Sequence, residues 1–280
     1  MRLPIFAAFS VVWVPAVFAQ APALSPGSTN YALIEADNGK TVGSADVSVA
    51  TTAGGYQITS RGDLKMAKFN YSFSNSNRLD SQLNIVRDEL TGSVNGAQVT
   101  FDLASDSTGR QFQISISAKG KTTTNTVDRH QHLALLPDLD PAAYIAMTHF
   151  ALEQPPTTWV IVPKQNGVLV PAQYNGDPDV SATIQGQSAT VHHTSVTVSE
   201  QNGITIELYY TSDGRLLEAD LPEQNFYVVR DGFRLQNRPH YAPPRGEAPP
   251  PDAQQPGQDG SPQPESHQNV GLSGPLAAIS

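Results

Sequence analysis

The sequence predicts a mainly β fold, an antiparallel meander curled into a barrel or half-barrel around one central helix, with a disordered C-terminal tail. Three observations lead to this prediction. Apolar and polar residues alternate through most of 31–235, as they do in strands that bury one face. Seven Asn-Gly or Asp-Gly pairs interrupt the alternation at the spacing of hairpin turns. One segment, 140–152, has the composition of a buried helix.

The first residues have the features of a secretory signal peptide. Arg2 supplies the positive charge, an apolar run extends from Ile5 to Val14, and the chain up to Ala19 suits cleavage. The apolar run is shorter than the roughly 20 residues that cross a bilayer as a helix. We therefore expect a signal peptide over 1–19, a flexible lead-in over 20–30, and an exported protein, periplasmic or extracellular, without a membrane span.

Strands are predicted from Tyr31 to Ser117. The clearest has Phe69, Tyr71 and Phe73 on one face and small polar residues on the other. Such alternation is typical of an antiparallel sheet with one dry and one wet face. The Thr-rich stretch 119–128 has no dry face and is predicted to be a polar connector.

The central helix is predicted over 140–152. The Asp140 side chain can cap the first N–H groups, and Pro141 occupies a position where its missing N–H is not needed. Residues 142–152 carry no formal charge, which is typical of a helix that is buried on all sides. Pro155 and Pro156 prevent the helix from continuing.

Strands resume at Trp159 and continue to Arg230. Turns are predicted at all seven pairs: Asn38-Gly39, Asn95-Gly96, Asn166-Gly167, Asn175-Gly176, Asn202-Gly203, Asp213-Gly214 and Asp231-Gly232. The folded unit is then a single domain over 31–238. Residues 239–280 contain 10 prolines in 42 positions and no apolar periodicity, so a disordered Pro-rich tail is predicted there.

Charge and composition exclude several classes of protein. Asp and Glu number 26 against 17 Lys and Arg, and no basic stripe interrupts the acidic excess. This field repels phosphate backbones, so nucleic acid is not an expected partner. The chain has no Cys, which excludes disulfides, thiolate nucleophiles and Cys-ligated metals.

The histidines are the first candidates for a metal site. His130 and His132 would point the same way on a strand, but no third ligand stands at a motif spacing, so they are weak candidates. His192 and His193 are adjacent and would point to opposite faces. His149 lies in the apolar helix, where it is either a hydrogen-bonded core residue or a ligand contact.

Enzymatic chemistry has little support in the sequence. No G-x-S-x-G elbow and no phosphate-binding glycine loop is present. Glu207 and Glu218 could form a carboxylate pair, although acidic residues on the wet face of a sheet are usually only solvated. We assign no catalytic residue and expect no cofactor.

A curled sheet around a helix leaves an interior that is either filled by side chains or hollow. A hollow interior would bind apolar ligands, whereas aromatic residues at these spacings more often form a plain core. The candidate ligand-binding residues share a bulky side chain that the pattern places inside: Tyr71, Phe73, Phe112, Tyr144, Met147, His149 and Trp159.

The stretch His192–Arg234 contains three segments: H-H-T-S-V-T-V-S, I-T-I-E-L-Y-Y-T-S-D-G-R-L-L-E-A-D-L-P and N-F-Y-V-V-R-D-G-F-R. This stretch resembles a family of uncharacterised secreted bacterial β-proteins. Such families are similar in shape to half-barrel lipoprotein carriers and lipocalin-like proteins, and similar domains precede some α/β-hydrolases. The resemblance implies a fold and transfers no catalytic residue.

The function expected from these patterns is that of an exported, non-enzymatic protein that binds a lipid or another hydrophobic or amphipathic ligand, in envelope lipid traffic. One alternative is a structural or interaction protein with a fully packed sheet and a tail that binds a protein partner. The second alternative is a hydrolase-associated protein or an enzyme that uses His149 or the pair His130 and His132.

Overall fold

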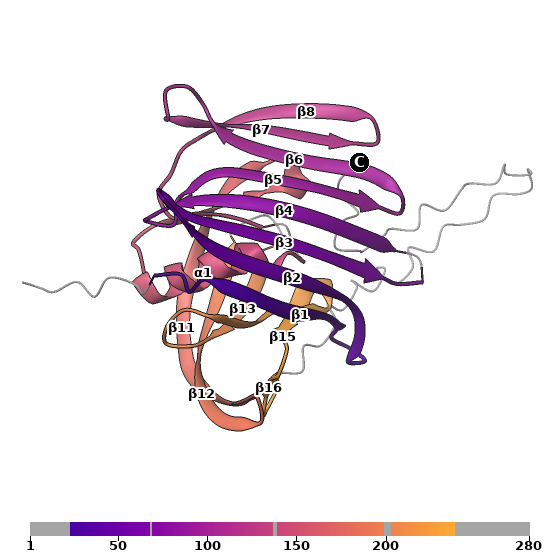
Figure 1. The fold of residues 1–280 in the computed structure, drawn as a ribbon, viewed down its shortest axis with the longest axis vertical. Coiled ribbons are helices and arrows are strands. Elements are labelled where there is room, and N and C mark those ends of the chain that lie inside the picture. Colours follow the sequence, from indigo (N-terminus) through magenta and orange to yellow (C-terminus); the bar gives the residue numbers. More distant parts are fainter. Residues whose placement is uncertain (1–22, 68, 137–138, 199–202, 239–280) are drawn as a thin grey trace, which may run out of the picture.

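A computed structural model of the chain describes residues 23–67, 69–136, 139–198 and 203–238. Within these residues the chain is mainly β, with one α-helix (Figure 1). The signal peptide predicted over 1–19 and the disordered tail predicted over 239–280 lie outside the described residues. The fold class predicted from the sequence is confirmed for the part that the structure describes.

The first half is a meander of eight antiparallel strands, each paired with the next along the chain. The strands are β1 (Gly27–Glu35), β2 (Lys40–Thr52), β3 (Gly55–Lys65), β4 (Asn70–Asp80), β5 (Ile85–Val94), β6 (Ala97–Ser105), β7 (Gln111–Ala118) and β8 (Lys121–Asp128). The alternation predicted from the sequence holds in β4, where Tyr71, Phe73 and Leu79 are buried and Ser72 and Arg78 are exposed.

The second half contains the helix and the remaining strands. Its elements are β9 (Leu133–Leu135), α1 (Pro141–Glu153), β10 (Thr158–Val162), the 3-10 turn η1 (Pro163–Gln165), β11 (Val168–Ile184), β12 (Gln187–Val198), β13 (Ile204–Tyr210), β14 (Leu216–Leu221), the 3-10 turn η2 (Pro222–Gln224), β15 (Phe226–Arg230) and β16 (Phe233–Leu235). β10 pairs in parallel with β9, and β16 pairs with the far end of β11.

The two halves join into one sheet through the pairing of β1 with β15. Tyr31 lies opposite Arg230 and Glu35 opposite Phe226, so five residue pairs connect segments from opposite ends of the domain. The strand order runs from β8 at one edge to β9 at the other. The described sheet is therefore an open half-barrel and not a closed barrel.

The helix α1 lies inside the curve of the sheet and contacts β2, β3, β9, β13 and β14 (Figure 1). Asp140 is its N-cap and accepts a hydrogen bond of 3.0 Å from the N–H of Ala142. Gln154 ends the helix in the left-handed conformation. Every residue from Pro141 to Ala151 is buried, so the predicted uncharged helix fills the interior.

Apolar side chains form two clusters on opposite faces of the sheet. The larger lies between α1 and the inner face, and it includes Leu208 and Val196. The smaller lies on the outer face of the second half, where Tyr209 and Leu217 pack beneath β16. The outer face is therefore dry in one region, beside the long hairpin of β11 and β12.

The connector predicted over 119–128 is wrong, because residues Lys121–Asp128 form the edge strand β8. Lys119 and Gly120 both have positive φ, 49° and 74°, and turn the chain tightly from β7 into β8. Consecutive β-branched threonines favour the extended backbone. The strand lacks apolar alternation because almost all of its residues are exposed at the sheet edge.

Two smaller predictions also need correction. The flexible lead-in over 20–30 is wrong in its last residues, since β1 begins at Gly27 and Leu24 is already buried. The turn predicted at Asn175-Gly176 is wrong because this pair lies within β11, and the chain reverses at Gln185-Gly186. The pair Asn202-Gly203 cannot be compared, since residues 199–202 lie outside the described part.

Candidate functional site

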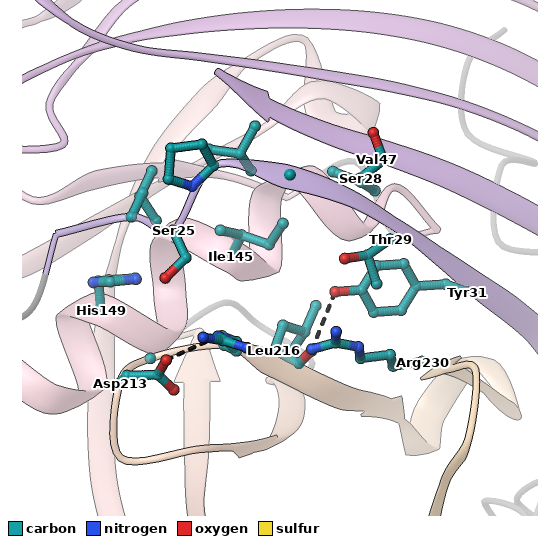
Figure 2. A pocket seen from close by; sticks show the side chains of 16 residues that line it. Ser25, Ser28, Thr29, Tyr31, Val47, Ile145, His149, Asp213, Leu216 and Arg230 are labelled. Atoms are coloured by element: carbon teal, nitrogen blue, oxygen red, sulfur yellow. Dashed lines mark hydrogen bonds and ion pairs between the residues drawn. The ribbon is translucent and has the colours of Figure 1, made fainter. Parts of the chain in front are cut away.

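A pocket of about 190 Å³ lies beside the buried helix, where three segments meet (Figure 2). The segment Leu24–Thr29, which ends in the first residues of β1, forms one wall, and Ile145 and His149 of α1 form the second. The third wall is Asp213–Leu216, at the turn between β13 and β14. Residues more than a hundred positions apart in the sequence therefore line one site.

Thr148, the residue before His149 in α1, holds the helix against the turn between β13 and β14. The hydroxyl of Thr148 donates to the carbonyl oxygen of Gly214 at 2.7 Å and also lies 2.8 Å from that of Ile145. Gly214 has φ +79°, and a Cβ there would lie 2.7 Å from Nε2 of His149. The turn can approach the imidazole this closely because Gly214 has no side chain.

Replacing Gly214 by Ala should lower the free energy of unfolding by about 1–3 kcal/mol, since it combines a strained positive φ with a contact inside van der Waals distance. Chemical denaturation of both proteins measures this. The matched control is Gly96→Ala, where φ is +84° but no atom lies within 4 Å of the added Cβ. Equal losses in the two variants would show that contact with His149 contributes nothing.

The floor of the pocket is formed by a cross-strand pair, Tyr31 of β1 and Arg230 of β15. The hydroxyl of Tyr31 donates to the carbonyl oxygen of Leu216 at 3.1 Å, which ties β1 to β14. Burial raises the pKa of this phenol, and the positive charge of Arg230 acts in the opposite direction. Tyr31 is therefore a neutral hydrogen-bond donor, and the guanidinium of Arg230 is close enough to interact electrostatically with it.

The two arginines that line the pocket differ in their ion pairing. Arg215 is paired with Asp213 at 2.8 Å, whereas Arg230 forms no ion pair with any residue that the structure describes (Figure 2). Apolar side chains line the same space: Leu24, Tyr31, Val47, Val49, Ile145 and Leu216. The pocket thus combines apolar side chains with one cation, Arg230, that forms no ion pair with a described residue.

Six of the seven residues predicted to bind a ligand lie outside this pocket. Tyr71 and Phe73 stack on each other with ring centroids 5.3 Å apart, inside the main core. Phe112, Tyr144 and Met147 are fully buried in the same core. These side chains fill the space that a hollow barrel would have kept open for a ligand.

The two other predicted residues differ from this group. Trp159 is half-buried near the sheet edge and stacks on His130, with ring centroids 4.4 Å apart. His149 is buried and is the one of the seven predicted residues that lines the pocket.

The weak metal candidates are each engaged with other neighbours. His130 stacks on Trp159, and Nε2 of His132 lies 3.8 Å from a carboxylate oxygen of Glu153. Among the described residues, no cluster of three metal-ligating side chains includes either histidine. The two-residue spacing of His130 and His132 therefore does not correspond to a metal site shared by the two side chains in the described part of the chain.

Sequence reasoning missed Arg230, Asp213 and the segment Leu24–Thr29. Nothing local marks Arg230, which reads as the polar end of a strand, because its role depends on the pairing of β1 with β15. The segment before β1 looked like a linker because it is rich in Pro, Ser and Gly. The one signal in this segment was its apolar residue, Leu24, which is buried in the structure.

Comparisons with known proteins support the fold. No family model matches the chain, and no curated protein matches it. Among solved structures, the chain is similar to a β-barrel-like protein of the domain of unknown function DUF1849 from Brucella abortus, with 11% identity and a TM-score of 0.50, covering 78% of this chain and 100% of that one. A DUF1089 family protein from Pseudomonas aeruginosa also matches, with 11% identity and a TM-score of 0.40, covering 76% of this chain and 97% of that one.

At this identity the likeness to the DUF1849 structure shows a β-barrel-like fold alone. This fold is consistent with the resemblance to uncharacterised β-proteins that the sequence suggested. In the described part of the chain, the single α-helix is too short to cross a bilayer.

Proposed function

We propose that this protein is an exported, non-enzymatic binding protein whose pocket takes a small amphipathic anion, such as the carboxylate end of a single-chain lipid. The observation that carries the proposal is Arg230, a cation without an anionic partner among the described residues, set beside an apolar wall. A ligand carboxylate would pair with this guanidinium, and the hydroxyls of Ser25 and Thr29, which line the pocket, supply further donors. Export is inferred from the signal peptide predicted over 1–19.

The size of the pocket limits what it holds. Its volume of about 190 Å³ is smaller than the roughly 300–1,000 Å³ of sites that enclose a drug-sized molecule. We therefore propose that the anionic end and the first carbons of the chain enter, with the apolar part against Ile145 and Val47. A two-chain phospholipid is too large for this site.

Native mass spectrometry of the protein purified from its host compartment tests the proposal directly. The expected result is an adduct with the mass of a single-chain carboxylate, and addition of a medium-chain fatty acid should restore it after delipidation. A protein that carries no adduct and binds neither a fatty acid nor the matching alcohol would refute the proposed function.

The Arg230→Gln variant should bind a medium-chain fatty acid about 10–100-fold more weakly than the natural protein. The reason is that a charge-assisted hydrogen bond contributes about 1.5–3 kcal/mol. Isothermal titration of the delipidated protein measures the change. The matched control is Arg234→Gln, an exposed arginine on β16 outside the pocket, which should leave the affinity unchanged. Equal affinity in the Arg230 variant would show that the headgroup does not bind there.

A second candidate function is favoured by the filled interior. Phe112, Tyr144 and Met147 are fully buried in the core between the sheet and α1, as expected for a structural or interaction protein. Its partner would be a protein, reached through the Pro-rich segment predicted over 239–280. Failure of every lipid titration, together with capture of one defined protein that requires this segment, would support it over the first.

A further inference from the structure

A second group of polar side chains lies outside the pocket, on the outer face of β11, β12 and β13. Asp177 lies opposite His193 in the β11–β12 ladder, and Ser195 lies opposite Glu207 in the β12–β13 ladder. Directly opposed residues share a face, and so do residues two apart on a strand. The four side chains therefore project from the same side of the sheet, which is the side opposite α1.

The distances within this group are those of a common site. Nε2 of His193 lies 2.8 Å from Oε2 of Glu207, and its Nδ1 lies 3.8 Å from Oδ2 of Asp177. One ligand atom from each of the three residues lies within 4.8 Å of the other two. The two distances start from different ring nitrogens, and only one nitrogen would coordinate an ion. In a tetrahedral Zn²⁺ site, bonds of about 2.0–2.2 Å place neighbouring ligand atoms about 3.4 Å apart, a spacing within reach of ligand atoms that lie within 4.8 Å of one another.

Ser195 shows that hydrogen bonds alone do not satisfy the two carboxylates. Its Oγ lies 2.5 Å from Oδ2 of Asp177 and 2.7 Å from Oε2 of Glu207. A hydroxyl carries one proton and can donate it to one of these oxygens at a time. At the other short contact, two oxygen lone pairs face each other without a proton from Ser195 between them, and a nearby positive charge would relieve the resulting repulsion.

The charged residues around this group do not supply such a positive charge. Asp220 lies opposite Glu207 on β14, and Glu218 follows on the same face. Arg238 pairs with both, with its Nη1 at 2.6 Å from Glu218 and 3.3 Å from Asp220. Its guanidinium is therefore already used by two carboxylates. Among the described residues, the imidazole of His193 is what faces the charges of both Asp177 and Glu207.

We infer that Asp177, His193 and Glu207 bind a divalent transition-metal ion, Zn²⁺ or Mn²⁺, on the outer face of the sheet. One imidazole nitrogen with two carboxylate oxygens is a ligand set that these ions use. Three protein ligands leave a position for water or the Ser195 hydroxyl. Part of each side chain is accessible, 34% for Asp177, 17% for His193 and 14% for Glu207, so an ion can enter from solvent.

The imidazole is held in place by a neighbour that does not contact the ion. The ring of Tyr209 stacks on that of His193, with centroids 4.6 Å apart and planes 6° from parallel. Tyr209 is buried in the outer cluster beneath β16, so it gives the imidazole a rigid support. Tyr209 is thus a positioning residue for the site.

Isothermal titration of the full chain, freed of tags and treated with chelator, tests the inference with ZnCl₂ and MnCl₂ as the probes. The natural protein should bind one equivalent of at least one ion and show a raised Tm in its presence. His193→Ala should weaken binding by more than about 100-fold, since loss of an outer partner alone costs about 10–100-fold. The matched control is His192→Ala, which removes an imidazole from the opposite face that pairs with Asp179.

The inference is overturned if the natural protein binds neither ion, in which case His193 is simply the polar neighbour of two carboxylates. It is also overturned if His193→Ala and His192→Ala bind with equal affinity. Near-UV circular dichroism shows whether each variant is folded, and Glu207→Gln replaces His193→Ala if the latter is not. Arg230→Gln should bind the metal normally, so this result does not depend on the proposed ligand pocket.

Discussion

Met147→Asp should abolish the cooperatively folded domain at neutral pH. Met147 is fully buried in the centre of α1, within the core between the helix and the sheet. An ionised carboxylate there would lose its hydration without gaining a partner, at a cost of several kcal/mol. Because a typical domain is stable by only about 5–15 kcal/mol, a cost of this size removes most of its margin.

Urea denaturation followed by tryptophan fluorescence measures the effect, with Met147→Leu as the control. Leucine keeps the apolar character and nearly the same volume, so it should cost less than about 1.5 kcal/mol. A soluble Met147→Asp protein with the same transition midpoint as the natural chain would show that α1 is not the centre of the fold.

Asp88→Asn should stabilise the domain above about pH 4 and flatten the dependence of its stability on pH. Asp88 lies on β5 with 1% of its surface exposed, opposite Asn77 of β4. The amide of Asn75 donates to Asp88 at 3.4 Å and to Asp140 at 2.7 Å. Burial raises the pKa of the Asp88 carboxyl well above its usual range, and the nearby carboxyl of Asp140 raises it further.

The sign follows from proton binding. Asp88 titrates near pH 4 in the unfolded chain and at higher pH in the folded one, so the folded state binds more protons between these values. Stability is therefore lost as pH rises through the folded-state pKa. Burial also raises the pKa of Asp140, which adds a contribution of the same sign.

Thermal unfolding between pH 4 and pH 8 measures this effect. Asn has nearly the shape of Asp and never ionises, so the midpoint of Asp88→Asn should exceed that of the natural chain at pH 7. A gain of about 1 kcal/mol corresponds to about 2–4 °C in a domain of this size. The control is Asp63→Asn, an exposed position on β3. A lower midpoint for Asp88→Asn at pH 7 would contradict the expectation.

The fold was predictable wherever the deciding information is local. Asp140 and Pro141 mark the start of α1, and the alternation around Tyr71 marks a strand, because both depend only on neighbours in sequence. The strand β8 was missed because an exposed edge needs no apolar alternation. The extent of β11 was missed because Asn175-Gly176 has the composition of a turn but lies within a ladder.

The candidate sites were much less predictable. His149 was identified because a histidine in an uncharged helix is conspicuous. Arg230, and the grouping of His193 with Asp177 and Glu207, depend on which strands pair and in which register. A shift of one residue in β12 would move His193 to the opposite face, and no local pattern fixes that register. The interior is filled for a related reason, since the size of a cavity depends on how all side chains pack together.

The pairing of β1 with β15 also has a consequence for how the chain folds as it is made. β1 can form its ladder with β2 as soon as the first hairpin emerges, but its other edge stays unpaired until residues 226–230 arrive. Contacts of such long sequence separation form slowly, and an open strand edge can meanwhile pair with a second copy of the chain. Nascent chains that stop before β15 should therefore depend on chaperones far more than the complete domain does.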